Sequence, residues 1–234
     1  MSESSKLLSR PLSQWFCCAL FCIHILVLAG GTAWAEGGHF VSFGLAGGSV
    51  IAPNAELEST PPSGDADFDG GYSIKASLGF LLAKKFQLEA EYLHTYNRID
   101  SIINPPTVTD LVDSDRATHS LMLNATYRVE VPPQGDTYWV RRGYYVYFGG
   151  GVGVSWQDYT VETLAIRADS SIAWQVVIGF EKMHSSAYWL TAYPSPFLQY
   201  RFLHITEGDF GVFKADASLH LIEFGFRFYG GFGS

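Results

Sequence analysis

Apolar and polar residues alternate with a period of two along most of the chain after residue 40. Such alternation predicts β-strands that each have one apolar and one polar face. Tyr72, Ile74 and Ala76, for example, share a face, and Lys75 lies on the other. The pattern predicts eight strands, which cover all or part of 41–45, 68–82, 86–92, 120–130, 144–157, 174–180, 198–202 and 215–228.

The strand lengths distinguish two folds that both show this alternation, a membrane barrel and a soluble sandwich. Most stretches can be extended to roughly 9 to 15 residues, which suits tilted strands that cross a membrane, whereas strands of a soluble sandwich have about five or six. No apolar run after residue 35 reaches the roughly 18 residues of a membrane helix. A closed barrel is the other structure that satisfies all backbone groups in lipid. We therefore predict an all-β fold, an eight-stranded antiparallel up-and-down transmembrane β-barrel, with a soluble sandwich as the alternative.

The links between strands follow from strand parity. Leu82 and Phe86 share the apolar face, so 83–85 is expected to be a three-residue hairpin link that places Lys75 diagonal to Glu91. If the mature N-terminus is periplasmic, four links lie outside the cell and three inside. The outside links are strongly acidic. The expected outside links are 53–67, 98–116, 158–171 and 205–214, and the inside links are 83–85, 132–143 and 181–187 or beyond.

The last strand contains a conflict of phase. Ala217, Leu219 and Leu221 occupy odd positions, whereas the apolar residues after them, Phe224 and Phe226, occupy even positions. One extra residue near 222–223 would reconcile the two sets, so we expect a β-bulge there. The bulge would keep Glu223, Gly225 and Arg227 facing inward.

The first 35 residues have the features of a secretory signal peptide. Lys6 and Arg10 precede a largely apolar segment at 15–28, and Ala33-Trp34-Ala35 is a small-x-small cleavage site. We expect residues 1–35 to be a signal peptide and residues 36–234 to form one barrel domain. All three cysteines precede the cleavage site, so the mature chain would have no disulfide and no cysteine metal site.

Charge excludes one class of partner. The chain has 15 basic and 23 acidic residues, and cleavage removes Lys6, Arg10 and Glu3, which leaves 13 and 22. Nucleic-acid binding needs a basic face, so no nucleic-acid partner is expected.

Several short motifs, in their order along the chain, resemble the opacity-protein or porin-family group of eight-stranded outer-membrane barrels. The motifs are Gly79-Phe80, Phe86–Tyr92, Leu121–Arg128, Tyr147–Val154, Ala173–Gly179, Leu198–Arg201 and Phe224–Phe228, within 39–228. The resemblance implies a Gram-negative outer membrane with both mature termini periplasmic. It also implies contact with outer-membrane lipid and lipopolysaccharide, and with periplasmic chaperones and barrel-assembly machinery during biogenesis. Chains of this group end on an aromatic residue, whereas six residues follow Phe228 here.

Side chains fill the interior of an eight-stranded barrel. The predicted inward face carries eight charged residues, which must be paired if they are buried. We therefore predict an internal salt-bridge network that plugs the lumen, with a narrow polar path as the alternative. Its expected members are Lys75, Glu89, Glu91, Arg128, Glu130, Arg201, Glu223 and Arg227.

Two motifs suggest a metal or a cofactor only weakly. Asp65, Asp67 and Asp69 match the first half of a calcium loop, but Ala76 stands where the bidentate glutamate is needed. The glycine run 149–153 lacks both the spacing and the following helix of a dinucleotide site. Small inward residues beneath a crowded lumen explain this run better. No cofactor or metal is expected.

The stretch Tyr200–Thr206 resembles the His-x-Ser segment of the lipid A 3-O-deacylases, which are also eight-stranded barrels. That resemblance implies His204 as a base and Thr206 in the serine position, both facing outward near the outer rim. Asp216 is the best candidate for orienting the histidine. Threonine replaces serine, and Glu207 stands where that family has asparagine.

The leading hypothesis is a non-enzymatic outer-membrane protein with a structural or surface-interaction role, whose acidic outer loops contact an extracellular or host ligand. A small-solute pore and a lipid A deacylase are the alternatives.

Overall fold

The computed structural model describes most of the chain after residue 38. The chain divides into two units, residues 1–38 and 39–234. The expected signal peptide lies outside the described residues, which contain no helix able to span a membrane. The described residues are 39–53, 55–58, 64–82, 85–104, 107–132, 143–161, 164–167, 170–182, 194–209 and 214–232.

Eight long strands form the wall of the barrel, and two short strands extend it. The short ones are β2 (Ala55–Glu58) and β7 (Leu164–Arg167). The long ones are β1 (His39–Ile51), β3 (Gly64–Leu82), β4 (Phe86–Asn104), β5 (Thr107–Val131), β6 (Tyr144–Val161), β8 (Ser171–Lys182), β9 (Ser195–Asp209) and β10 (Lys214–Phe232).

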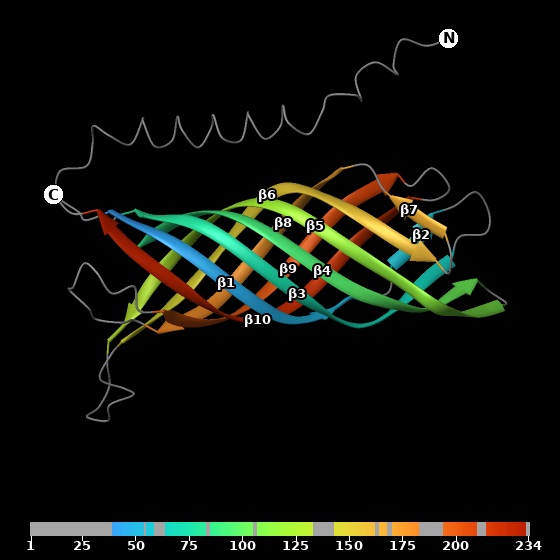
Figure 1. The fold of residues 1–234 in the computed structure, drawn as a ribbon, viewed down its shortest axis with the longest axis horizontal. Coiled ribbons are helices and arrows are strands. Elements are labelled where there is room, and N and C mark those ends of the chain that lie inside the picture. Colours follow the sequence, from blue (N-terminus) through green and yellow to red (C-terminus); the bar gives the residue numbers. More distant parts are fainter. Residues whose placement is uncertain are drawn as a thin grey trace, which may run out of the picture. The chain divides into compact units, whose positions relative to one another are not determined.

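The sheet closes on itself because β1 pairs with both β3 and β10. Every other long strand pairs antiparallel with its two neighbours, so the ring runs β1-β3-β4-β5-β6-β8-β9-β10 (Figure 1). Closure leaves no long strand with a free edge. The predicted eight-stranded antiparallel barrel is confirmed.

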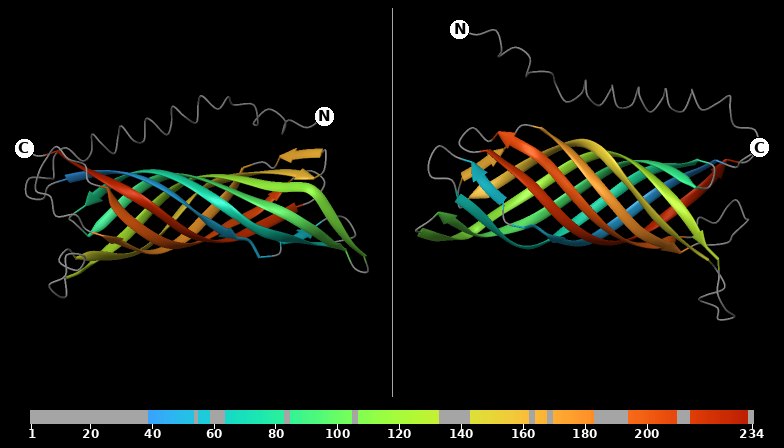
Figure 2. Two further views of the ribbon diagram at one scale, coloured as in Figure 1. Left: turned by 60° about the horizontal axis from the view of Figure 1, so that its bottom comes forward. Right: turned by 180° about the vertical axis from the view of Figure 1, so that it is seen from behind.

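The two ends of the barrel differ. β1 begins and β10 ends at one end, called here the terminal end. β2 and β7 lie at the opposite end, called the distal end (Figure 2).

Alternation along the strands separates two surfaces. In β8, Ser171, Ala173, Gln175 and Val177 are buried, and the residues between them are 40–65 % exposed. The exposed residues are Ile172, Trp174, Val176, Ile178 and Phe180. Large exposed apolar side chains in an unbroken row are unfavourable in water but suit the acyl chains of a bilayer. The predicted assignment of the apolar face to the outside is therefore confirmed for this strand.

The three-residue link after β3 is confirmed. Leu82 pairs with Phe86, and Lys75 lies diagonal to Glu91 because Lys75 pairs with Leu93 and Ser77 with Glu91.

Other predicted link boundaries were wrong, because strand pairing continues where the apolar alternation stops. β4 reaches Asn104 and β5 begins at Thr107, so most of the expected link 98–116 is a paired hairpin. β2 and β7 lie within the expected links 53–67 and 158–171, and β9 continues to Asp209. Polar side chains suffice for a ladder, since its bonds are made by the backbone.

The bulge expected near 222–223 was also wrong. Leu221, Ile222 and Glu223 pair in unbroken register with Arg201, Tyr200 and Gln199, and the irregularity lies between Ala215 and Ala217. Leu219 and Leu221 face inward and are fully buried, with the same parity as Glu223 and Arg227. There is no phase conflict, because the inner face changes from apolar to charged along a regular strand.

The lumen consequently has two layers. In the distal half, apolar side chains such as Val50, Leu203 and Leu219 form a cluster, beside buried polar side chains of β3 to β6 such as Asn97 and Arg116. Toward the terminal end, charged and amide side chains fill it. The register places Leu203 and Leu219 opposite each other, and Arg201 and Leu221 are the next inward pair toward the terminal end.

Candidate functional site: the buried ion-pair network

Four basic and four acidic side chains form one network in the terminal half of the lumen. None of these residues is more than 7 % exposed. Four positive and four negative charges give a formally neutral group, which limits the cost of removing them from water. The network comprises Lys75, Arg128, Arg201 and Arg227 with Glu89, Glu91, Glu181 and Glu223.

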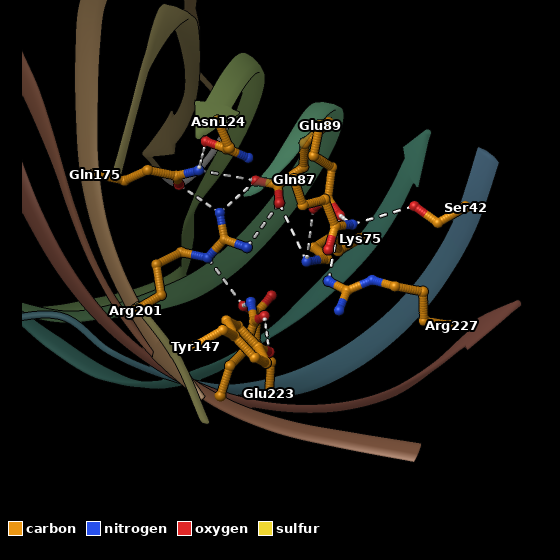
Figure 3. Close-up of polar contacts among 12 residues, drawn as sticks. Ser42, Lys75, Gln87, Glu89, Asn124, Tyr147, Gln175, Arg201, Glu223 and Arg227 are labelled. Atoms are coloured by element: carbon orange, nitrogen blue, oxygen red, sulfur yellow. Dashed lines mark hydrogen bonds and ion pairs between the residues drawn. The ribbon is translucent and has the colours of Figure 1, made fainter. Parts of the chain in front are cut away.

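Arg201 and Glu91 meet across the lumen. Arg201 lies on β9 and Glu91 on β4, and these strands are four places apart in either direction around the ring of eight. Arg201 Nη2 donates to Glu91 Oε2 at 2.9 Å, and Nη1 donates to Glu91 Oε1. The same guanidinium contacts Gln175 and Glu223 (Figure 3). Arg201 Nε donates to Glu223 Oε2 at 2.9 Å. This bidentate geometry is the strong form of a charged hydrogen bond, and here it connects opposite walls.

Glu181 is a second centre of the network, near the terminal end. It accepts from Arg227 Nη1, lies 3.2 Å from Arg128 Nη2, and accepts from Tyr229 Oη at 2.5 Å. Arg227 Nη2 also donates to Glu89 Oε2 at 3.2 Å. Glu181 thus connects β5, β8 and β10.

Lys75 joins the two centres. Its Nζ lies 3.4 Å from Glu89 Oε1 and 3.2 Å from Glu91 Oε2. Because Glu91 binds Arg201 and Glu89 binds Arg227, the ion pairs form one continuous group.

Amide side chains add further hydrogen bonds to the network. Gln175 donates from Nε2 to Glu91 Oε1 at 3.2 Å and to Asn124 Oδ1 at 2.5 Å, and its own oxygen accepts from Arg201. Gln199 donates to Glu223 Oε2 at 2.6 Å and accepts from Tyr147 Oη at 2.9 Å. Buried polar groups are stable only when bonded in this way.

Seven of the eight charged residues expected on the inner face lie in this network. The exception is Glu130, which is exposed two residues beyond Arg128, where β5 ends at Val131. Among the described residues, Glu130 takes part in no ion pair.

Sequence reasoning missed Glu181. The apolar alternation of β8 ends at Phe180, so 181–187 was assigned to a link, but the strand continues to Lys182. The sequence did indicate an inward position, since Glu181 and the inward-facing Gln175 both have odd numbers in the same strand.

The residues proposed for a deacylase do not form a triad. His204 and Thr206 are half-buried positions on the outward face, as expected, but Thr206 Oγ1 donates to the backbone oxygen of Ile172 at 3.0 Å. Asp216 is exposed at the irregular part of β10. His204 Nδ1 instead lies 3.1 Å from Ser218 Oγ.

The acidic motif at the start of β3 has no metal-binding geometry in the part described. Asp67 is half-buried and Asp69 is exposed, while the side chain of Asp65 lies outside the described residues. The register of β3 is irregular from Asp67 to Gly71. No group of three potential ligands occurs among the side chains that are described.

No protein-family model matches the chain, and no curated protein has a significant match to its sequence. Among solved structures, the outer membrane protein OprG from Pseudomonas aeruginosa matches with a TM-score of 0.50 and 16% identity, covering 82% of this chain and 96% of OprG. The fold is that of an outer-membrane β-barrel. At this identity the likeness concerns the fold alone.

Two further solved barrels are similar. Neisserial surface protein A matches with a TM-score of 0.49 and 16% identity, covering 82% of this chain and 99% of that protein. Ail, the attachment invasion locus protein of Yersinia pestis, matches with a TM-score of 0.36 and 13% identity, covering 82% and 99%.

Proposed function

We propose that this chain is an integral protein of a Gram-negative outer membrane whose lumen is closed by the ion-pair network. It serves as a rigid anchor that presents the distal end to the outside. The observation that carries the proposal is the contact of Arg201 with Glu91 across the full width of the barrel. A small-solute pore would need an open path through the part of the lumen that this ion pair occupies.

The energetics favour a closed lumen. Breaking one member of a buried ion pair leaves an uncompensated charge and costs about 3–5 kcal/mol. A solute or a hydrated ion that passed through the terminal half would have to separate several such contacts together, and it would then meet the apolar layer around Leu203 and Leu219. A charge-filled interior without a water-filled channel suits an anchor.

The orientation is part of the proposal. Both mature termini are placed in the periplasm, so that the distal end is extracellular. The acidic links there are then available to an extracellular or host ligand, and divalent cations can connect them to lipopolysaccharide phosphates. Aromatic residues on the outward face, such as Tyr72, Trp156 and Trp174, serve as contacts with the bilayer and its interfaces.

Planar-bilayer recording tests the closed lumen. Purified protein is expected to be electrically silent, whereas Glu91→Ala combined with Arg201→Ala is expected to show openings, because the contact across the lumen is gone. Arg98→Ala is the matched control, since Arg98 is exposed on β4 and should leave the protein silent. Steady ionic current through the wild-type protein would contradict the proposal.

A second candidate function is hydrolysis of an ester of lipid A. The contact of His204 with Ser218 favours it, because a histidine within hydrogen-bond reach of a serine hydroxyl is the arrangement that activates a nucleophile. In this version Ser218 Oγ, not Thr206, attacks the acyl carbonyl carbon and His204 accepts its proton. The ester C–O bond then breaks, the lipid A hydroxyl leaves with that proton, and water hydrolyses the acyl-serine to release the fatty acid.

Mass spectrometry of lipid A tests the hydrolase. Cells that produce the wild-type protein are expected to contain lipid A that has lost an acyl chain, and His204→Ala should restore the full set. His220→Ala is the control, because His220 also faces outward but contacts Tyr200 Oη at 2.6 Å. Identical spectra with and without the protein would exclude this activity.

A further inference from the structure

Arg116 is a buried charge outside the ion-pair network. It is 1 % exposed on β5, and it is the fifth basic residue buried in the lumen beside four acidic ones. The described side chains form no ion pair with it, and its Nε and Nη2 atoms have no hydrogen-bond partner. The guanidinium lies over the ring of Phe68, whose centre is 4.0 Å from Cζ. A buried guanidinium without a counter-charge costs several kcal/mol.

Unbonded polar groups lie beside it in adjoining rows of the same wall. The inner faces of β3 to β6 bring Ser73, Thr95, Thr118 and Gln157 into one row of paired positions. The next row toward the distal end contains Asn97, Arg116 and Tyr159. The atoms without a partner are Ser73 Oγ, Thr95 Oγ1, Asn97 Oδ1, Thr118 Oγ1 and Gln157 Nε2, besides those of Arg116.

Donors predominate in this group. Arg116 Nε and Nη2 and Gln157 Nε2 can only donate, and the three hydroxyls can each donate one hydrogen. Asn97 Oδ1 is the one unbonded atom of the group that can only accept, because Asn97 Nδ2 donates to Asp69 O at 3.4 Å. Water would satisfy hydrogen bonds but would leave the charge of Arg116 uncompensated.

Among the described side chains near Arg116, Asp67 is the carboxylate on the inner face: it is half-buried opposite Ser101 and forms no ion pair with the guanidinium. Asp115 and Asp158 have the opposite parity and lie on the outward face, where Asp115 accepts from Tyr96 Oη at 3.4 Å and Asp158 lies 3.8 Å from His119 Nε2. Across the lumen lie apolar residues such as Ile205 and Ala217. An anion beside Arg116 would therefore be held in a medium of low polarity, where each hydrogen bond is strong.

We propose that Arg116, with the row of Ser73, Thr95, Thr118 and Gln157, binds a small oxyanion, a carboxylate or a phosphate, in the distal half of the lumen. The anion neutralises the guanidinium and accepts hydrogen bonds from the hydroxyls and from Gln157. The site is separate from the terminal network, so its presence or absence does not depend on whether the barrel conducts ions.

Anion-dependent stability of the full barrel tests the proposal. Refolded protein in detergent micelles is titrated with sodium formate, with inorganic phosphate, and with sodium chloride at matched ionic strength, and the unfolding midpoint is recorded. A ligand that binds only the folded state raises the midpoint in a saturable way. The wild-type protein is expected to respond to formate or to phosphate beyond the chloride response, and whichever responds identifies the oxyanion. Arg116→Gln should abolish the difference, and Arg98→Gln should retain it.

Two further measurements keep the test decisive if Arg116→Gln does not fold. Thr118→Val retains the charge but removes one hydroxyl, and it should shift the titration to higher anion concentration. The Nε–Hε resonance of Arg116 in an NMR spectrum should move with the same half-saturation point. A wild-type midpoint that responds to formate and phosphate no more than to chloride, or an Arg116 resonance that does not move, would overturn the proposal.

Discussion

Gly151 leaves space for the amide groups at the centre of the network. A Cβ atom built at Gly151 would lie 1.9 Å from Asn124 Oδ1 and 2.6 Å from the backbone oxygen of Leu123. The backbone cannot give way without breaking the ladder, and Asn124 would lose its contact with Gln175. The glycine run of β6 is therefore a packing requirement of the lumen, in agreement with the interpretation of 149–153 as small inward residues.

Replacing Gly151 with alanine should consequently destabilise the barrel. Overpacking of this kind costs about 1–3 kcal/mol in the free energy of unfolding, which urea titration in micelles or vesicles measures. Gly230→Ala is the matched control, because a Cβ at Gly230 meets nothing within 4 Å. Equal stability of the two variants would show that the network is not packed as described.

At the scale of the element, strand parity was the most informative feature of the sequence. It correctly assigned the outward side chains of β8 and the hairpin at 83–85, because a period of two follows directly from strand geometry. It could not locate the strand ends, because the paired segments beyond the bilayer lack the alternation of apolar residues. It also failed on β10, where inward leucines resembled an outward face.

The register of β10 predicts which of its apolar residues matter most for stability. Leu219 is fully buried in the lumen and Ile222 is 54 % exposed on the outer wall. Leu219→Ala should cost about 2–5 kcal/mol because it leaves a cavity, and Ile222→Ala should cost less because lipid fills the space. Unfolding free energies of both variants check this order. The reverse order would favour the bulge at 222–223.

At the scale of the whole molecule, the sequence identified charged residues of the lumen but not their partners. Arg201 and Glu91 are far apart in the chain and meet only because the closed ring places β9 opposite β4. Such pairings depend on how the strands tilt and stagger around the barrel, which parity does not contain. The separate apolar layer was missed for a related reason, since an inward leucine and an outward leucine look alike in one strand.

The arrangement of the barrel also determines which of the buried charges are paired. Four basic and four acidic residues neutralise one another in the terminal half of the lumen, and Arg116 remains without a counter-charge among the described side chains.

Fractionation of Gram-negative cells with gel electrophoresis tests most directly that the alternating strands form an outer-membrane barrel. The protein should be found in the outer-membrane fraction, and an unboiled sample should migrate faster than a boiled one, because a closed barrel resists unfolding by detergent. The opposite result would be a soluble protein whose mobility is the same before and after boiling. It would contradict the membrane barrel and every proposal that depends on it.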